Sequence, residues 1–392
     1  GQIKLDGIPL TSGDISAWQR CCSEVPQNIN LLDASVLENI AFGCPEEDIN
    51  YDEVWDAICA AQLYELITEM PHGLYTKVGE NGFNYELSGE NWGELPEGWV
   101  YKEATAVDVD SKDRVYVFNR GTCPVIVFDT DGKIIDTWGE GVFKNPHGIT
   151  VGPDDELFCV DNGDSTVRKF SSEGKLLMTI GEPGAGSPKM SGIPFAKPTH
   201  VAVNKSNGEF YVADGYSNAS VHKYSPDGKL LLTWGESGTG PGQFNIVHNI
   251  STDRNGLVYV ADRENHRIQI FDSEGKYIDQ WINLSRAACL YIDKRGNEDI
   301  FYVGEYFSGI ASNDTGKDLG PRISIFDKTG KLLSRLGVES YGPGVGRFYS
   351  PHGISVDSKG NIYVAEVSYS DYGQFLNPKR ELRSLQKLSK IN

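Results

Sequence analysis

With 392 residues, the chain is longer than one hydrophobic core requires, and we expect it to fold as two structural units. Its 44 glycines and 19 tyrosines favour many short strands joined by turns, and it contains no run of about 18 apolar residues that could span a membrane. The net charge of -19 would repel a phosphate backbone, which argues against nucleic acid as a partner.

Residues 1–84 have the patterning of a small α/β segment. Residues 33–42 (DASVLENIAF) predict a short helix that begins at an aspartate or serine cap. Residues 52–69 (DEVWDAICAAQLYELITE) carry apolar side chains at three- and four-residue spacing, which predicts an amphipathic helix.

Three stretches of residues 1–84 resemble the nucleotide-binding domain of an ABC exporter. They read GQIKLDGIPL, SEVPQNINLLDASVLENIAFG and VWDAICAAQLYELITEMPHGLYTKVGENG, and Gln27 matches the glutamine of the Q-loop. No GxxxxGK[ST] phosphate loop and no Walker B strand accompanies them. We therefore expect a partial ABC-like segment for which ATP is not a ligand, either a fused fragment or a segment that retains a docking role.

Residues 85–392 repeat a strand pattern at intervals of roughly 40–55 residues, which is typical of a propeller. The second strand of each repeat is the easiest to align: DRVYVFNRG, ELFCVDNGD, EFYVADGYS, LVYVADREN, IFYVGEYFS and NIYVAEVSY. Five third strands end in a glycine turn that favours a hairpin: VIVFDTDGK, VRKFSSEGK, VHKYSPDGK, IQIFDSEGK and ISIFDKTGK. The pattern predicts a mainly β fold, a six-bladed β-propeller.

The last repeat lacks a fourth strand, because the sequence stops after SLQKLSKIN. Residues 85–93 (YELSGENWG) could supply that strand and close blade six, which would remove an exposed sheet edge. Residues 261–271 (ADRENHRIQIF) are close to the NHL repeat signature. By this resemblance, residues 85–392 are identified as a six-bladed NHL propeller, with a domain boundary near residue 85.

Three histidines fall in one column when the six repeats are aligned. The first strand of each blade lines the channel, and one position of it reads Thr105, His147, Thr199, His248, Ala288 and His352. Histidines from alternate blades, roughly 120° apart in a six-bladed ring, would meet at the axis. Three protein ligands with one open position form a catalytic zinc site. The alternative is three polar core histidines that cap turns.

The other histidines fit this column less well. His200 lies one position off it, whereas His222 and His266 lie in third strands or the turns before them and are expected to be partly exposed. A second column is mostly acidic, and we expect its members to brace turns by accepting backbone hydrogen bonds: Asn119, Asp161, Asp214, Asp262, Glu305 and Glu366.

The motifs FNRG, NPHGI, KPTHVAV, ADGYSN, GQFNIVHNI, ADRENHRIQ and SPHGI resemble peptidyl-α-hydroxyglycine α-amidating lyase. The resemblance implies a zinc held by His147, His248 and His352. It also implies cleavage of the carbon–nitrogen bond of an α-hydroxyglycine-type hemiaminal, which releases an amide and glyoxylate. Matched by motif, the catalytic tyrosine is Tyr216, and the substrate-binding arginines are Arg120 and Arg263.

This chemistry is coherent with the residue types. Zinc would polarise a hydroxyl or carboxylate oxygen as a Lewis acid, and Tyr216 could take the hydroxyl proton. Arg120 or Arg263 could hold a carboxylate of a small-molecule or peptide substrate in a two-point fork. The alternatives are a packed aromatic on the blade face for Tyr216, and an ion pair with the acidic column for Arg263.

Three positions depart from the lyase pattern. Ser217 replaces the cysteine after the tyrosine, so the family's disulfide is not expected. Gly353 replaces a calcium-binding aspartate, which argues against calcium in the channel, and Ser350 replaces a methionine. The copper monooxygenase that makes the family's substrate is not in this chain, so a different hemiaminal, hydroxy acid or amide stays open as the substrate.

Two other functions compete with a zinc lyase. A non-catalytic NHL scaffold would bind a protein or peptide on its rim, but it has no need of three axial imidazoles. A propeller hydrolase or lactonase tends to use acids and amides around calcium, whereas Asn119 is the only amide in the acidic column. The location is open, because no signal peptide opens this sequence, which as written would be cytoplasmic, while the lyase family is often exported.

Overall fold

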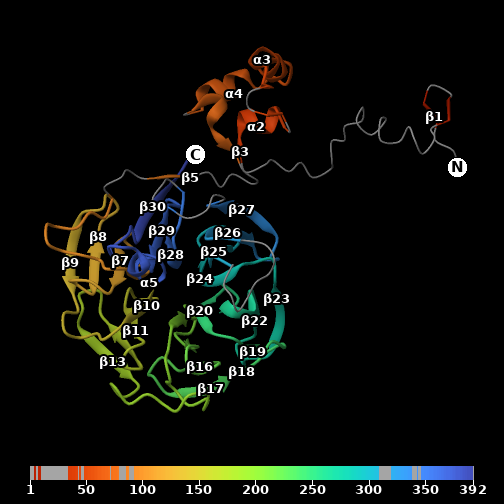
Figure 1. The fold of residues 1–392 in the computed structure, drawn as a ribbon. Helices are drawn as coiled ribbons and strands as arrows, with labels where there is room; N and C mark the ends of the chain where they lie inside the picture. Colours follow the sequence, from red (N-terminus) through yellow and green to blue (C-terminus); the bar gives the residue numbers. More distant parts are fainter. Residues whose placement is uncertain are drawn as a thin grey trace. The chain divides into compact units, whose positions relative to one another are not determined.

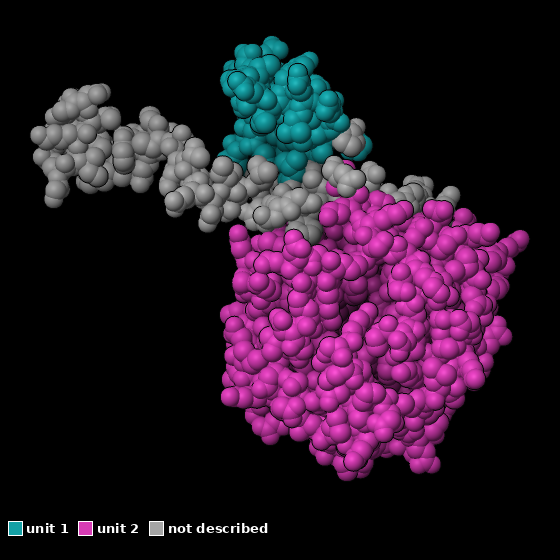
Figure 2. Space-filling view, turned by 180° about the vertical axis from the view of Figure 1, so that it is seen from behind, with its two compact units in different colours: residues 1–80 teal, residues 81–392 magenta. Residues whose placement is uncertain are grey.

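The computed structural model describes residues 34–42, 44–45, 48–70, 72–78, 85–87, 92–308, 319–337, 342 and 346–391, and two short strands within residues 4–9. The chain divides into two compact units, Gly1–Glu80 and Asn81–Asn392 (Figure 2). Gln27 lies outside the described residues. No helix in the described part of the chain is long and apolar enough to cross a membrane.

The first unit contains short helices around a small apolar core. Its elements are β1 (Lys4–Leu5), β2 (Ile8–Pro9), β3 (Ala34–Ser35), α2 (Val36–Ile40), α3 (Tyr51–Ala60), α4 (Tyr64–Glu69), η2 (Gly73–Tyr75) and β4 (Lys77–Val78). Ser35 caps α2, because its Oγ accepts the N–H of Glu38 at 3.1 Å. The core is formed by Val36, Leu37, Val54, Ile58, Ile67 and Leu74.

The expectation of one helix over residues 52–69 is wrong, because the structure has two helices there. α3 ends at Ala60 and α4 begins at Tyr64. Gln62 between them has a positive φ of 59°, a backbone conformation that cannot continue a right-handed helix. The periodic apolar pattern is continuous in the sequence because Ile58 and Ile67 both face the same core.

The second unit contains, within its described residues, six four-stranded antiparallel sheets around a common axis (Figure 1). Blade one consists of β6 (Ala104–Val109), β7 (Val115–Asn119), β8 (Val125–Phe128) and β9 (Ile134–Trp138). Blade two consists of β10 (Pro146–Val151), β11 (Leu157–Asp161), β12 (Thr166–Phe170) and β13 (Leu176–Ile180). Blade three consists of β14 (His200–Val203), β15 (Phe210–Asp214), β16 (Ser220–Tyr224) and β17 (Leu230–Trp234). Blade four consists of β20 (Val247–Thr252), β21 (Val258–Asp262), β22 (Arg267–Phe271) and β23 (Tyr277–Trp281). Blade five consists of β24 (Arg286–Asp293), β25 (Ile300–Tyr306), β26 (Arg322–Asp327) and β27 (Leu332–Leu336). The prediction of a mainly β, six-bladed propeller is confirmed.

Blade six joins the two ends of the second unit. Its strands are β28 (Pro351–Val356), β29 (Ile362–Glu366), β30 (Leu385–Lys390) and β5 (Tyr85–Leu87). β5 pairs antiparallel with β30, with Leu87 opposite Leu388 and Tyr85 opposite Lys390. A strand from the start of the unit thus completes a sheet whose other three strands come from its end.

Shorter elements lie in the connections that follow a second or a fourth strand. They are the parallel pair β18 (Glu236–Ser237) and β19 (Gln243–Phe244), and the single turns η4 (Arg263–Asn265), α5 (Ser368–Asp371) and η5 (Gly373–Phe375).

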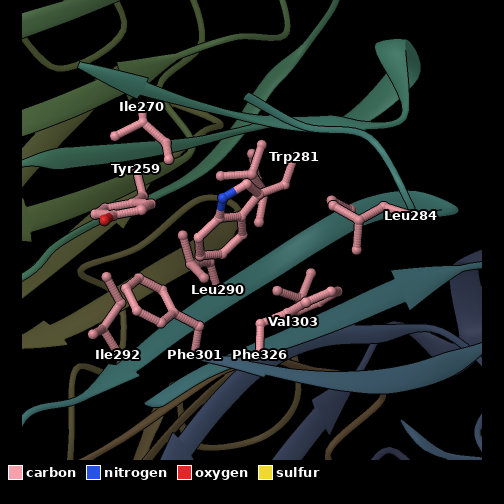
Figure 3. Close-up of a cluster of buried hydrophobic side chains, with 12 residues drawn as sticks. Tyr259, Ile270, Trp281, Leu284, Leu290, Ile292, Phe301, Val303 and Phe326 are labelled. Carbon is pink, nitrogen blue, oxygen red and sulfur yellow. The ribbon is translucent and has the colours of Figure 1, made fainter. Parts of the chain in front are cut away.

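Apolar cores lie between neighbouring blades, because each sheet is covered on both faces. Figure 3 shows one of them, in which Tyr259 and Ile270 of blade four face Phe301 and Val303 of blade five. The Trp281 ring lies 5.0 Å from the Phe301 ring. Burial of each such side chain stabilises the fold by about 1.5–3 kcal/mol. Second strands are therefore apolar on both faces, and every residue of β7, β11, β15, β21 and β29 is buried.

The glycine turns of the repeats pack on tryptophans of the preceding blade. Gly174 has a φ of +78°, and a Cβ there would lie 2.7 Å from the Trp138 ring. The same arrangement recurs around the ring, in the pairs Gly132–Trp92, Gly275–Trp234 and Gly330–Trp281. The terminal Trp-Gly motif and the hairpin glycine of the repeats are thus two halves of one contact between blades.

Candidate metal centre

Each histidine of the column lies at a β-bulge at the start of an inner strand. In β10 the register passes from Pro146, opposite Asp161, to Gly148, opposite Val160, so His147 has no residue opposite it. The same irregularity brackets His248 in β20 and His352 in β28. A bulge re-aims a side chain that would otherwise follow the pleat. This backbone feature explains why one position per blade can point to the axis.

The side chains of the three column histidines converge on one point of the structure. One ligand nitrogen from each of His147, His248 and His352 lies within 4.8 Å of the other two. The rings are all buried, and their centroids are separated by 4.5 to 5.2 Å. The structure therefore brings together the three side chains that the sequence proposed as metal ligands.

Backbone carbonyls fix the tautomer of all three rings. Each Nδ1 lies against the carbonyl oxygen of the column residue in the following blade: Thr199 at 2.8 Å for His147, Ala288 at 2.5 Å for His248 and Thr105 at 2.5 Å for His352. A carbonyl oxygen only accepts, so Nδ1 carries the proton and donates it. Nε2 then keeps a lone pair toward the axis, which is the arrangement that an imidazole ligand requires.

Burial keeps the three imidazoles neutral. It lowers the pKa of His147 and His248 well below the usual value, and that of His352 to about 3. The positive charges of Arg120 and Arg263 lower these pKa values further. Three neutral, oriented imidazoles fit a divalent ion such as zinc, because metal binding requires the deprotonated nitrogen.

Tyr216 reaches the triad from the loop after β15. Its hydroxyl lies 2.9 Å from Nε2 of His248 and 3.3 Å from Nε2 of His147. The preceding Gly215 passes so close to the inner strand that a Cβ there would overlap the carbonyl oxygen of Val247. Glycine at this position therefore allows the loop to carry the tyrosine to the axis.

Arg263 lies against Tyr216 at the end of blade four. Its Nη1 donates to the Tyr216 hydroxyl at 3.3 Å, and its guanidinium lies 5.5 Å from the centre of that ring. Its ion pair is with Glu264, at 2.7 Å, and not with the acidic column. The column residue Asp262 is paired with Arg267 instead. The proposed ion pair of Arg263 with the column is therefore wrong.

Arg120 lies on the opposite blade, next to the strand of His147. Its Nε donates to the carbonyl of Pro146 at 3.1 Å, and its Nη1 pairs with Glu103 at 2.6 Å. Because its charge lowers the pKa of His147 and His352, it acts electrostatically on the triad. Arg120 and Arg263 thus give the site a positive field although the chain as a whole is acidic.

Sequence reasoning missed Tyr306 and Arg286. Tyr306 is buried, and the guanidiniums of Arg263 and Arg286 lie 5.6 and 5.4 Å from the centre of its ring. The ring is also 6.2 Å from that of His248. Burial raises the pKa of Tyr306 well above its usual value. Tyr306 is the last residue of β25, directly after the column residue Glu305, whereas Tyr216 lies two residues after Asp214, so alignment of the repeats does not match the two tyrosines.

The acidic column braces turns as expected. Asp161 accepts the N–H groups of Lys144 and Asn145, and Asp214 accepts those of Ala196 and Lys197. The expectation of a partly exposed His222 is wrong. It is fully buried between Asp214, at 3.4 Å, and the hydroxyl of Thr233, at 2.9 Å.

The family comparison agrees with this architecture. A model of the NHL repeat matches residues 195–224, 244–271 and 348–370. Three of the six blades thus contain NHL repeats. The three matched stretches cover the first three strands of blades three and four and the first two strands of blade six.

Curated relatives fall into two groups. The chain is 34% identical over 253 residues to peptidyl-alpha-hydroxyglycine alpha-amidating lyase 1 of Drosophila melanogaster. The aligned region covers 60% of this chain and 45% of that protein. It is 37% identical over 190 residues to NHL repeat-containing protein 3 of Mus musculus, and this aligned region covers 45% of this chain and 54% of that protein. The chain therefore spans about half the length, or less, of the curated relatives that it matches.

A third relative is of a different class. Over 89 residues, 23% of this chain and 14% of that protein, the chain is 39% identical to the ATP-dependent lipid A-core flippase of Francisella novicida. This match agrees with an ABC-exporter resemblance in one part of the chain.

Proposed function

We propose that the NHL propeller is a metal-dependent lyase that cleaves the carbon–nitrogen bond of an α-hydroxyglycine-type hemiaminal. The observation that carries the proposal is the position of the Tyr216 hydroxyl, 2.9 Å from Nε2 of His248, beside three imidazole nitrogens within 4.8 Å of one another. The similarity to the fly amidating lyase supports it. The products would be an amide and glyoxylate.

His147, His248 and His352 would hold the metal through their Nε2 atoms. Zinc, when bound in such a three-histidine site, supplies a Lewis acid with one open position for a substrate oxygen. The carbonyls that accept from Nδ1 would keep the rings oriented whether or not the fourth position is filled.

Tyr216 would move the proton. As the phenolate, Tyr216 would accept the proton of the substrate hydroxyl, whose O–H electrons form the new carbon–oxygen double bond while the carbon–nitrogen bond breaks. The nitrogen would leave with the electron pair and take that proton back from the Tyr216 phenol to become an amide, which regenerates the phenolate. The hydroxyl proton is thus exchanged for one on nitrogen, and the reaction needs no oxidant or other co-reactant.

The two arginines would hold the substrate carboxylate. Arg263 is the better placed of the two for the reacting centre, because its Nη1 already contacts the Tyr216 hydroxyl at 3.3 Å. Arg120 acts from the other side, next to the Pro146–His147 backbone. A planar guanidinium recognises a carboxylate through two parallel hydrogen bonds, which fixes its orientation as well as its charge.

Calcium is not part of the proposed site. A Cβ on Gly353 would lie 2.6 Å from the Cα of Ala106 in the neighbouring blade. A carboxylate at this position would require β6 to move. The packing of β28 against β6 therefore supports the expectation that the channel lacks this ligand.

A second candidate function is a non-catalytic NHL scaffold that binds a protein or peptide. The similarity to mouse NHL repeat-containing protein 3 favours it. A scaffold would not need oriented, neutral imidazoles with a tyrosine between them.

The test is an assay of glyoxylate release from an N-acyl-α-hydroxyglycine by the purified full chain, with zinc added. We expect release that depends on protein concentration, that a chelator removes, and that the Tyr216→Phe variant lacks. Release no faster than the uncatalysed background, from a protein shown to hold zinc, would reject the lyase and favour the scaffold.

A further inference from the structure

The central channel contains a chamber beyond the histidine triad. It has a volume of about 360 Å³ and is lined by residues of all six inner strands and of the turns that follow some of them, which include Asp108, His200, Asn249, Thr252, Lys294 and Gly353. Each inner strand begins near the triad and runs away from it, so the chamber lies on the side opposite the loops of Tyr216 and Arg263. None of the proposed catalytic or metal-binding residues lines it.

Three cationic side chains line this chamber. Arg295 is neutralised by Asp293, at 2.7 Å. Lys205 and Lys294 form no ion pair with a carboxylate among the described residues, and the Lys294 Nζ donates to the Thr252 hydroxyl at 3.4 Å. The more distant charges of Asp299, Asp253 and Asp108 favour the charged form of Lys294.

The two lysines repel each other. Burial lowers the pKa of Lys294 to about 8, and the charge of Lys205 lowers it further in the same direction. An anion between the two ammonium groups would offset both the cost of burying the Lys294 charge and the repulsion between the lysines, because it would add a negative charge beside them.

The carboxylates of the chamber are already engaged. Asp108 accepts the N–H groups of Val151 and Val109 at 2.7 and 2.8 Å, and the hydroxyl of Ser355 at 2.8 Å. Asp110 is paired with Arg114 at 2.6 Å. These acids of the lining are therefore engaged with other donors and form no ion pair with Lys205 or Lys294.

One further polar group in the chamber lacks a partner. Nδ1 of His200 is buried and has no hydrogen-bond partner among the described residues. His200 lines the same cavity as Lys294 and Thr252. A buried nitrogen without a partner costs free energy unless a bound group or water satisfies it.

We infer that this chamber is a binding site for a small oxyanion, a carboxylate or a phosphate, held by Lys205 and Lys294. The two ammonium groups provide both the positive charge and the N–H donors, which suits a compact ligand with two or three oxygens. The chamber is large enough for such an ion with some water. The site is separate from the histidine triad, so it does not depend on the lyase activity.

The test is isothermal titration calorimetry of the full chain with two probes, inorganic phosphate and glyoxylate. The variants are Lys294→Met and Lys205→Met, and the control is Lys276→Met, which removes an exposed lysine outside the chamber. The His248→Ala variant separates the chamber from the metal centre, because it disrupts the triad and leaves both lysines in place. Because Lys205 is exposed, its variant is expected to fold normally.

We expect at least one probe to bind, with an affinity at least tenfold lower in each chamber variant and unchanged in the Lys276→Met and His248→Ala variants. Binding of phosphate alone would assign the site to phosphates, and binding of glyoxylate alone would assign it to carboxylates. The inference is overturned if neither probe binds, if both chamber variants bind as the wild type does, or if the His248→Ala variant loses binding. Failure here would leave the lyase proposal intact.

Discussion

The hydroxyl of Tyr216 lies 2.9 Å from Nε2 of His248, although the two residues belong to different blades. Tyr216 arrives from the loop that follows the second strand of blade three, whereas His248 stands at the bulge of the first strand of blade four. The phenol oxygen is thus within hydrogen-bond distance of a nitrogen that would hold the metal. The proposed chemistry depends on this proximity of the Tyr216 hydroxyl to the His248 nitrogen.

The Tyr216→Phe variant tests that relationship. It removes one oxygen and keeps the ring, so we expect kcat for glyoxylate release to fall by about 10²- to 10⁴-fold, the usual contribution of a proton-transferring side chain. Metal content and thermal stability should not change. Tyr277→Phe, on the fourth strand of blade four, is the matched control. Equal losses in both variants would show that Tyr216 has no special role.

Gly215 should be as important to activity as a catalytic residue, for a steric reason. The Gly215→Ala change places a methyl group against the Val247 carbonyl and pushes the Tyr216 loop away from the axis. We expect a large loss of activity with zinc still bound, measured by single-turnover kinetics and metal analysis. Gly296→Ala is the control, because a Cβ there would meet its nearest neighbour at an ordinary 3.5 Å.

Arg263→Lys separates substrate binding from proton transfer. The ammonium keeps the charge but cannot form the two-point fork with a carboxylate, so KM should rise by tenfold or more, with a smaller change in kcat. Arg254→Lys, at a site paired with Asp299 away from the triad, should leave both constants unchanged. A fall in kcat with an unchanged KM would argue against a role in substrate binding.

The sequence predicted the blades well because their signals are local and repeated. Continuous apolar runs define the second strands, and glycine turns mark the ends of the third strands. Alignment on the second strands is enough to place His147, His248 and His352 in one column. The break at Gln62 could not be predicted, since both halves of the 52–69 pattern bury their apolar residues in one core.

The remainder of the site depends on contacts that no local pattern contains. Tyr306 is positioned by the guanidiniums of Arg263 and Arg286, which come from other strands and an adjacent blade. The bulges that turn the histidines inward are features of strand register, and only paired strands reveal them. The convergence of the three column histidines was therefore predictable, and motif matching also named Tyr216 and the two arginines Arg120 and Arg263. The positions of Tyr306 and Arg286 beside them were not predictable.

Stability should depend on pH through His200. Burial lowers its pKa from 6.5 to about 4 in the folded chain, so the unfolded chain binds the extra proton between these values. The free energy of unfolding should therefore fall as pH decreases from about 6.5 to 4, by at most about 3 kcal/mol from this residue, and less because the ring is partly exposed.

The measurement for His200 is urea unfolding of the wild type and of His200→Gln at several pH values, in buffers without phosphate or carboxylate. The difference in unfolding free energy between the two proteins should shrink as pH falls through this window, since glutamine does not titrate. A constant difference from pH 7 to pH 4 would contradict the lowered pKa.

Metal content is the most direct test of the central claim. Elemental mass spectrometry of the purified protein, compared with the His248→Ala variant, measures whether the three imidazoles hold an ion. We predict about one zinc per chain in the wild type, in line with a three-histidine site, and its loss in the variant. A wild-type protein without metal that takes up none when zinc is added would contradict the account.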